Sequence, residues 1–210
     1  MNEKFSHDMH IFTEKVGVYL PEDTHKIIKH RYQIATKLSK GKNTLEVGVG
    51  QGFGIQSIAK YSSEYTGIEY SSENVSYINK IQSNYRIIHG DAHNMPFDDS
   101  EFQIINALAM IYYLDIGKFL DEARRILSLN GTLFFCTSNK DVPGFVQAPF
   151  TTEYYSIPEL RNLLTSSGFD PKFYGSFAKY EQYEFLEKFK VIIKNVIKTI
   201  VNLFPYGGTL

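Results

Sequence analysis

Short apolar runs alternate with amphipathic stretches through the middle of the chain, from Thr44 to Thr137. The runs have the length of buried strands, and the stretches between them repeat their apolar residues at helical spacing. Strands that alternate with helices pair in parallel, with helices on both faces of the sheet. The pattern therefore predicts an α/β fold with a doubly wound, mostly parallel sheet. The predicted strands cover residues 45–48, 65–69, 86–89, 102–107 and 132–137, and the predicted helices cover 53–61, 73–83 and 118–129.

Further elements flank this core. A helix over 26–38 is expected to pack ahead of the first strand, and Asn130-Gly131 is expected to cap the helix over 118–129. The chain divides into a helical lead over 1–40, an α/β domain over 41–180 and a C-terminal segment over 181–210. After the fifth strand we expect a loop over 143–152, a helix over 157–165 that starts on Ser156, and a strand over 169–177.

The C-terminal segment predicts an amphipathic helix with a cationic side. Its apolar residues recur at helical spacing, while Lys190, Lys194 and Lys198 recur every fourth residue on another face. Such a stripe usually packs on a domain, and it is also the pattern of a helix that lies on a membrane surface. Two alternatives stay open: docking on the domain, or peripheral membrane contact from Phe185 to Phe204.

Composition excludes several classes of protein. A net charge of -1 over 210 residues gives no general field for a polyanion, so nucleic-acid binding is not expected. The single cysteine, Cys136, excludes an intramolecular disulfide and a cysteine-based zinc site, and the six histidines are too dispersed to predict a metal site. No secretory hydrophobic region opens the sequence, and no apolar run is long enough for a spanning helix. We therefore expect a cytoplasmic protein.

A glycine-rich turn follows the first predicted strand. Gly48, Gly50 and Gly52 stand where a buried strand must turn sharply into a helix, and glycine there lets the backbone approach a ligand. A glycine turn is also found in nicotinamide oxidoreductases and in tight turns that bind nothing. Glu46 favours another ligand, because a carboxylate two residues before Gly48 would repel a pyrophosphate and attract an ammonium group.

Two more acids follow successive strands. Glu69 ends the second predicted strand, where a carboxylate can accept both hydroxyls of a ribose. Asp91, in the run Gly90-Asp91-Ala92-His93, follows the third strand and can accept a hydrogen bond from an exocyclic amine such as that of adenine. Taken alone, Asp91 is equally compatible with an ordinary turn residue.

In order and spacing, these residues resemble the class I S-adenosylmethionine-dependent methyltransferases over about residues 30–177. Residues 44–54 resemble motif I, Glu69 the acid of motif II, residues 90–97 the "GDA…PF" motif and residues 102–114 motif IV. Residues 122–137, EARRILSLNGTLFFCT, are similar to the family's "E..RVLKPGG.L" segment. The resemblance implies a Rossmann-like fold with S-adenosyl-L-methionine as cofactor and S-adenosyl-L-homocysteine as product.

The resemblance also implies a role for each motif residue. Glu46 would face the methionine amino group, Glu69 would bind the ribose, and Asp91 would bracket the base. His30-Arg31-Tyr32 resembles the "H.RY" lead of relatives that act on sugars and envelope glycans, and the helical lead would lie toward the acceptor. The cofactor-binding residues implied are Arg31, Tyr32, Glu46, Gly48, Gly50, Gly52, Glu69, Tyr70, Asp91, Ala92, Asn106 and Leu108.

Two features depart from the family pattern. Many relatives carry a histidine pair where this sequence has Tyr112-Tyr113, so no imidazole base is expected there. Candidates for a general base are His93, Tyr112, Tyr113 and His10, of which histidine titrates in the more useful range. The usual seventh strand has no clear candidate after Phe177, unless residues 191–201 supply it.

The resulting hypothesis is methyl transfer from S-adenosylmethionine to a small-molecule or sugar/glycan acceptor, most simply at oxygen. A second hypothesis is a catalytically silent domain that keeps the cofactor pocket for regulation or for a partner. A third is a nicotinamide oxidoreductase, against which Glu46 and the motif at residues 90–97 both argue. The sequence predicts neither the acceptor nor the oligomeric state.

Overall fold

The computed structural model describes residues 22–175. Residues as far as Pro171 belong to one compact unit, and a second unit begins at Lys172, so the structural account below concerns the first. The predicted C-terminal amphipathic helix and the alternative strand over 191–201 lie outside the described residues, as does His10. Both readings of the C-terminal segment therefore stay predictions.

Five parallel strands form one sheet with the order β3-β2-β1-β4-β5. This confirms the predicted α/β fold with a parallel sheet. The strand order reverses at β1 and β4, the position at which sheets of this kind bind ligands beyond the carboxyl ends of their strands. The strands are β1 (Asn43–Val47), β2 (Glu64–Glu69), β3 (Arg86–His89), β4 (Phe102–Leu108) and β5 (Leu127–Cys136).

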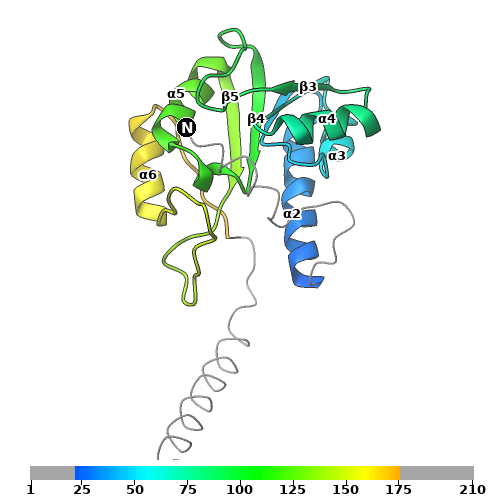
Figure 1. Cartoon of the computed structure of the whole chain (residues 1–210). Helices are drawn as coiled ribbons and strands as arrows, with labels where there is room; N and C mark the ends of the chain where they lie inside the picture. The colour runs from blue at the N-terminus through cyan, green and yellow to red at the C-terminus, as the bar shows by residue number, and fades with distance from the viewer. Residues whose placement is uncertain (1–21, 176–210) are drawn as a thin grey trace, which may run out of the picture. The chain divides into compact units, whose positions relative to one another are not determined.

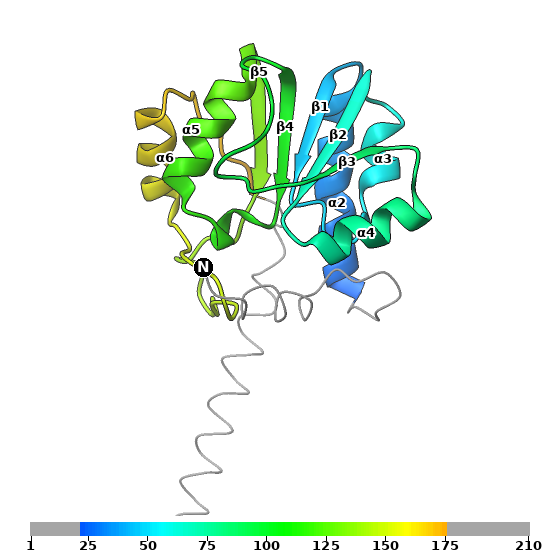
Figure 2. The same cartoon turned by 45° about the horizontal axis from the view of Figure 1, so that its top comes forward.

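Helices cover both faces of the sheet (Figure 1). In Figures 1 and 2, α2, α3 and α4 lie together on one side, while α5 and α6 lie on the other. Right-handed crossovers require this arrangement, because the chain moves in opposite directions along the sheet from β1 to β3 and from β4 to β5. The helices are α2 (Glu22–Ser39), α3 (Ile55–Ala59), α4 (Ser72–Ile81), α5 (Ile116–Ile126) and α6 (Ile157–Ser166), with a short 3₁₀ helix η2 (Ile111–Tyr113).

Side-chain caps fix where three helices begin. Ser71 accepts a hydrogen bond from the backbone N of Asn74 at the start of α4, and Asp115 accepts one from the backbone N of Lys118 at the start of α5. Ser156 and Glu159 form a capping box at the start of α6, which confirms the helix start predicted at Ser156.

The helices bury one apolar face each against the sheet. On the α2 side, Ile28 and Ala35 pack with Ile55, Ile58 and Ile78, all at most 3% exposed. The residues of α5 that are buried, Phe119 among them, recur at helical spacing. The sheet is thus a rigid support for the loops at the carboxyl ends of its strands.

The C-terminal end of one predicted helix and one predicted strand are wrong. The helix predicted over 118–129 ends at Ile126, and Asn130, with φ of 63°, lies inside β5 rather than at a helix cap. The Asn130-Gly131 bend instead falls where the pairing of β4 and β5 shifts its register. The strand predicted over 169–177 is not formed over its described part, residues 169–175.

Candidate functional site

The glycine turn and the tips of β1 and β2 form one connected backbone structure. Gly48 N donates to the carbonyl of Ile68 at 2.8 Å, and Gly50 N donates to Glu69 Oε2 at 2.8 Å. The turn is therefore fastened to the end of β2 by a backbone bond and a carboxylate bond. This is the edge of the sheet at which the strand order reverses (Figure 2).

The backbone conformation at all three positions of the turn favours glycine. Gly48, Gly50 and Gly52 have φ of 73°, 60° and 82°, a region that residues with a side chain rarely adopt. A Cβ built on Gly50 would have no neighbour within 4 Å, so the backbone there borders open space. A ligand can thus approach the turn most closely at Gly50.

Glu69 is the most firmly fixed acid of the site. It is 4% exposed, and its two oxygens accept hydrogen bonds from Gly50 N and from Ser71 N at 2.8 and 2.9 Å. Burial raises the pKa of Glu69, and the backbone hydrogen bonds from Ser71 and Gly50 oppose that rise. The side chain of Asn74 and the backbone of Tyr70 also bond this carboxyl, so a bound hydroxyl would share or replace one of these contacts.

Glu46 lies deeper than Glu69. It is 1% exposed, and its Oε2 accepts a hydrogen bond of 2.6 Å from the hydroxyl of Tyr65. The hydroxyl of Tyr32 also bonds this carboxyl. Burial raises the pKa of Glu46 to about 7, and the negative charge of Glu69 adds to the rise, while the tyrosine hydrogen bonds and Arg31 lower it.

Asp91 keeps one carboxylate oxygen for a ligand. Its Oδ1 accepts from His93 N at 2.9 Å and lies 2.7 Å from His93 Nδ1, and no hydrogen bond within the described residues engages Oδ2. Ala92 beside it is 7% exposed. Asp91 is therefore suited to the interaction predicted for it, that of accepting a bond from an exocyclic amine.

His93 is engaged at both ring nitrogens. Its Nε2 accepts a hydrogen bond from the backbone N of Asp115 at 3.0 Å, so the proton of the neutral ring belongs on Nδ1, which donates to Asp91. Neither nitrogen is then available to take a proton from an acceptor. In this arrangement His93 ties the loop after β3 to the start of α5, which argues against the role of general base predicted for it.

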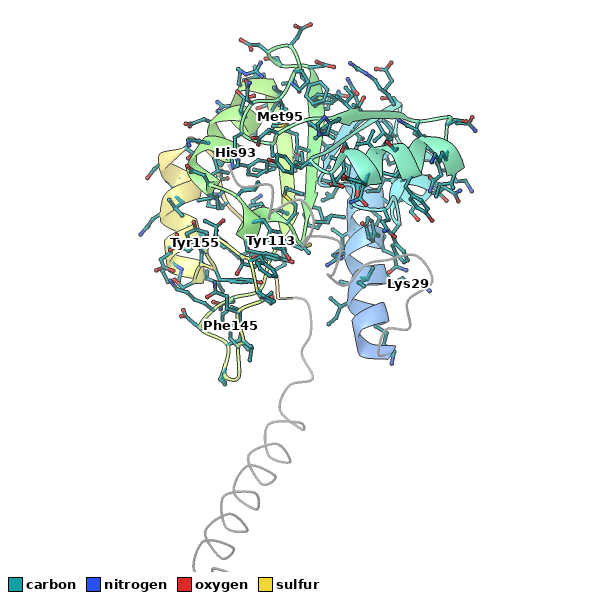
Figure 3. The ribbon with its side chains drawn as sticks, viewed as in Figure 1. Lys29, His93, Met95, Tyr113, Phe145 and Tyr155 are labelled. Atoms are coloured by element: carbon teal, nitrogen blue, oxygen red, sulfur yellow. The ribbon has the colours of Figure 1, made fainter. Side chains whose placement is uncertain are left out.

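Tyr112 and Tyr113 belong to an aromatic cluster with the segment after β5. Tyr112 stacks on Tyr154 with centroids 4.7 Å apart, and Phe145 meets Tyr154 edge-on at 4.8 Å. The ring centroid of Tyr113 lies 4.8 Å from that of Tyr112. Figure 3 shows Tyr113, Phe145 and Tyr155 on the same side of the molecule. Burial raises the pKa of both Tyr112 and Tyr113, so both phenols stay protonated near neutral pH and are poor bases.

The remaining predicted residues fall into two groups. Tyr70 is 43% exposed, directly after Glu69, as a residue that stacks on a ligand would be. Asn106 is fully buried, with Nδ2 donating to Ser39 Oγ at 3.0 Å, and Leu108 belongs to the apolar cluster. These two residues support the site from within the protein. The guanidinium of Arg31 lies 5.8 Å from the ring centroid of Tyr32.

The structure adds residues that sequence reasoning missed. A Cβ built on Gly48 would lie 3.1 Å from Cγ of Met110, so the Met110 side chain borders the glycine turn. Tyr65, Phe145 and Tyr154 were also missed. A hydrogen-bond donor to Glu46 could have been expected on the neighbouring strand. A single sequence does not give the register between two strands, so it could not single out Tyr65.

The described residues contain neither a metal-binding cluster nor a membrane-spanning helix. Over residues 22–175, no group of three histidine, cysteine or acidic side chains is placed to hold a metal ion. Among the same residues, no helix is both long and apolar enough to cross a membrane.

Comparison with known proteins finds a family model and relatives that are similar to this chain. Residues 45–135 match the family model described as "Methyltransferase domain". A protein of Mycolicibacterium smegmatis named as a probable S-adenosylmethionine-dependent methyltransferase is 27% identical over 158 residues, 72% of this chain and 62% of that protein. These findings support the class I S-adenosylmethionine-dependent methyltransferase family for this chain.

Two other methyltransferases are similar to this chain. The ubiquinone biosynthesis O-methyltransferase of Pelagibacter ubique is 26% identical over 160 residues, 73% of this chain and 64% of that protein. The crystal structure of geranyl diphosphate C-methyltransferase from Streptomyces coelicolor, which holds S-adenosyl-L-homocysteine, has a TM-score of 0.61 at 16% identity over 71% of this chain and 63% of that one. The chain spans less than two thirds of the length of both curated relatives.

The residues present fit the cofactor of this methyltransferase family. S-Adenosylmethionine offers an ammonium group, a ribose with two hydroxyls and an adenine with an exocyclic amine. Carboxyls stand at or just after the ends of three successive strands, at Glu46, Glu69 and Asp91, and a glycine turn with open space at Gly50 lies beside them. Glu46 and Glu69 are close enough for the charge of one to raise the pKa of the other.

Proposed function

We propose that this chain is a methyltransferase that passes the methyl group of S-adenosylmethionine to a small-molecule or sugar/glycan acceptor, most simply at oxygen. One observation supports it most strongly: Glu69 Oε2 accepts the 2.8 Å bond from Gly50 N, which joins the ribose-binding acid to the glycine turn. The carboxylate is thereby held ready at the place where the cofactor's hydroxyls would bind.

When bound, S-adenosylmethionine supplies a methyl group on a positively charged sulfur. In an in-line displacement the bond from this sulfur to the methyl carbon breaks, and neutral S-adenosylhomocysteine is the leaving group. The acceptor oxygen forms the new bond to carbon and loses its proton to solvent. The part of this chain is to place the two reactants in line and close together, an effect worth up to about 7–11 kcal/mol in favourable cases.

The side chains around β4 support catalysis by positioning rather than by a strong base. The phenols of Tyr112 and Tyr113 stay protonated and can donate hydrogen bonds to an acceptor, and His93 has both nitrogens engaged. An acceptor hydroxyl that ionises readily, such as a phenol, needs less help from a base than an alcohol does. The aromatic cluster of Tyr112, Tyr113, Phe145 and Tyr154 also suits a ring-containing acceptor.

The test is release of S-adenosylhomocysteine from the full chain with a panel of acceptors. The panel should pair phenols with sugars of similar size, and tritiated methyl groups should be recovered in the product. We expect turnover with at least one acceptor and loss of turnover in Glu69→Ala. Tight cofactor binding without transfer to any acceptor would instead support the catalytically silent domain.

Location and membrane contact are separate parts of the proposal. A cytoplasmic protein that touches the membrane through residues 185–204 would suit an acceptor carried on a lipid. Cosedimentation with vesicles containing anionic lipid, for the full chain and for a chain ending at residue 184, tests this. Equal and negligible pelleting of both chains would rule out the contact.

A further inference from the structure

Two tyrosine hydroxyls from different elements hold the carboxyl of Glu46. Tyr65 in β2 donates to Glu46 Oε2 at 2.6 Å, and the hydroxyl of Tyr32 in α2 bonds the same carboxyl. Glu46, Tyr32 and Tyr65 are 1%, 7% and 9% exposed. Since water hardly reaches the group, the tyrosines decide where the carboxyl lies.

The sheet register explains how Tyr65 reaches Glu46. Glu46 pairs with Gly67 of β2, and Tyr65 lies two residues earlier on the same face. A Cβ on Gly67 would lie 2.7 Å from Val49 Cγ2 and 2.8 Å from Ile87 Cδ1, so apolar neighbours exclude a side chain there. The hydroxyl of Tyr65 would lie 3.5 Å from that Cβ, so it runs along the strand directly beside Gly67.

The charges around Glu46 come from two elements. Arg31 and Tyr32 face it from α2, and Tyr65 and Glu69 face it from β2. On the other side, its register partner in β4 is Asn106, an uncharged amide. Burial raises the pKa of Glu46 to about 7, and the hydrogen bonds from Tyr65 and Tyr32 are the main influences that lower it. Without them the carboxyl would hold its proton at still higher pH.

We propose that Tyr65 is a positioning residue for the cofactor: its hydroxyl holds the carboxyl of Glu46 where it can bind the cofactor's ammonium group, and where Glu46 is protonated beforehand, that binding releases its proton. This inference rests on the proposed function, because it needs an ammonium-bearing ligand near β1. A nearby cation favours the ionised carboxyl, so binding below the pKa of Glu46 must expel a proton.

The experiment is calorimetric titration of the full chain with S-adenosylhomocysteine between pH 6 and pH 8.5. Each titration is run in two buffers with different ionisation enthalpies, which gives the number of protons released. In the unmodified chain we expect affinity to fall by up to about tenfold per pH unit below pH 7, with proton release rising as the pH falls. In Tyr65→Phe the affinity for S-adenosylhomocysteine should begin to fall at a higher pH than in the unmodified chain. The affinities of the two proteins should differ least near pH 8.5.

Tyr85→Phe is the matched control. The Tyr85 ring meets that of Tyr65 edge-on at 5.9 Å, so this variant removes a neighbouring hydroxyl without touching Glu46. It should leave the pH profile in place. If Tyr65→Phe does not fold, Tyr32→Phe removes the other hydroxyl and should shift the profile in the same direction.

Each outcome decides something different. An unshifted pH profile in a folded Tyr65→Phe or Tyr32→Phe variant, or a uniform loss of affinity at every pH, would overturn the positioning role. Affinity independent of pH in the unmodified chain would overturn the proton coupling. If the unmodified chain binds no S-adenosylhomocysteine at any pH, the proposed function fails as well.

Discussion

His93 accepts a hydrogen bond at Nε2 from the backbone N of Asp115, 3.0 Å away, while its Nδ1 lies 2.7 Å from Asp91 Oδ1. The imidazole thus connects the loop after β3, which carries Asp91, to the first turn of α5. A histidine beside an active site is readily taken for a base. Here the hydrogen bonds indicate that His93 holds Asp91 in place instead.

His93→Gln should therefore cost stability more than chemistry. Loss of a bridge between two loops should lower the free energy of unfolding by about 1–2 kcal/mol, because the hydrogen bonds are only partly buried. The turnover number should change by no more than a few-fold once cofactor is saturating. Urea unfolding and steady-state kinetics measure the two quantities. A drop in turnover of about a hundredfold or more, with unchanged stability, would restore the role of general base.

Glu69→Ala should weaken cofactor binding. It removes the acceptor for Gly50 N and the acceptor that we propose for the ribose hydroxyls, and bonds to a charged group are each worth about 1.5–3 kcal/mol. We expect the Kd for S-adenosylhomocysteine to rise by about tenfold to a hundredfold. The control is Glu64→Ala, which removes an exposed carboxylate from the other end of β2. Equal affinity in the two variants would contradict the ribose role.

Gly54→Ala should destabilise the fold. A Cβ at this position would overlap the ring of Tyr32, so the ring or the turn must move. Overpacking of this kind costs about 1–3 kcal/mol. Gly117→Ala is the control, because its Cβ would meet only Asp115 Oδ1 at 3.5 Å, and alanine in a helix is favoured by about 0.5–1 kcal/mol. Thermal unfolding should therefore move in opposite directions for the two variants, and a matching shift would count against the packing argument.

Arg125→Lys should loosen the loop between β3 and β4. The guanidinium bonds the carbonyls of Met95 and Phe97, and it also bonds the carboxylates of Glu122 and Asp99. A lysine can replace the charge but not this set of bonds. We expect faster amide exchange over residues 91–99 and weaker cofactor binding, with Arg124→Lys, an exposed neighbour, as control. Unchanged exchange over 91–99 would show that Arg125 does not hold the loop.

Glu122 gives the same contact a defined pH dependence. The hydrogen bond from Arg125 holds the pKa of Glu122 below its usual range. A group whose pKa is lowered on folding contributes stability above its unfolded pKa and loses it as the pH falls through the folded pKa. Glu122→Gln should therefore lower the free energy of unfolding at pH 7. In acid, where the unmodified chain also loses this contribution, the free energies of unfolding of the two proteins should approach each other. A difference that stays constant from pH 7 to pH 3 would contradict the coupling.

Local pattern predicted most of this fold because the strands are short, buried and separated by clear helical stretches. The glycine turn and the carboxyls of Glu46, Glu69 and Asp91 could be located because topology brings the ends of parallel strands to one edge. Local pattern could not predict that β5 starts directly at the end of α5, since Leu127 to Leu129 suit a helix and a strand alike. The partners of His93 and Glu46 depend on register and loop packing between distant residues, on which a single sequence carries no direct information.

We propose that the glycine turn and its three carboxyls form a site for a sulfonium nucleoside. The decisive measurement is calorimetric titration of the full chain at pH 8 with S-adenosylhomocysteine and, separately, with NAD. We expect saturable one-to-one binding of S-adenosylhomocysteine, weakened in Glu69→Ala, and no binding of NAD. Binding of NAD without binding of S-adenosylhomocysteine would show that this site is not built for a sulfonium nucleoside.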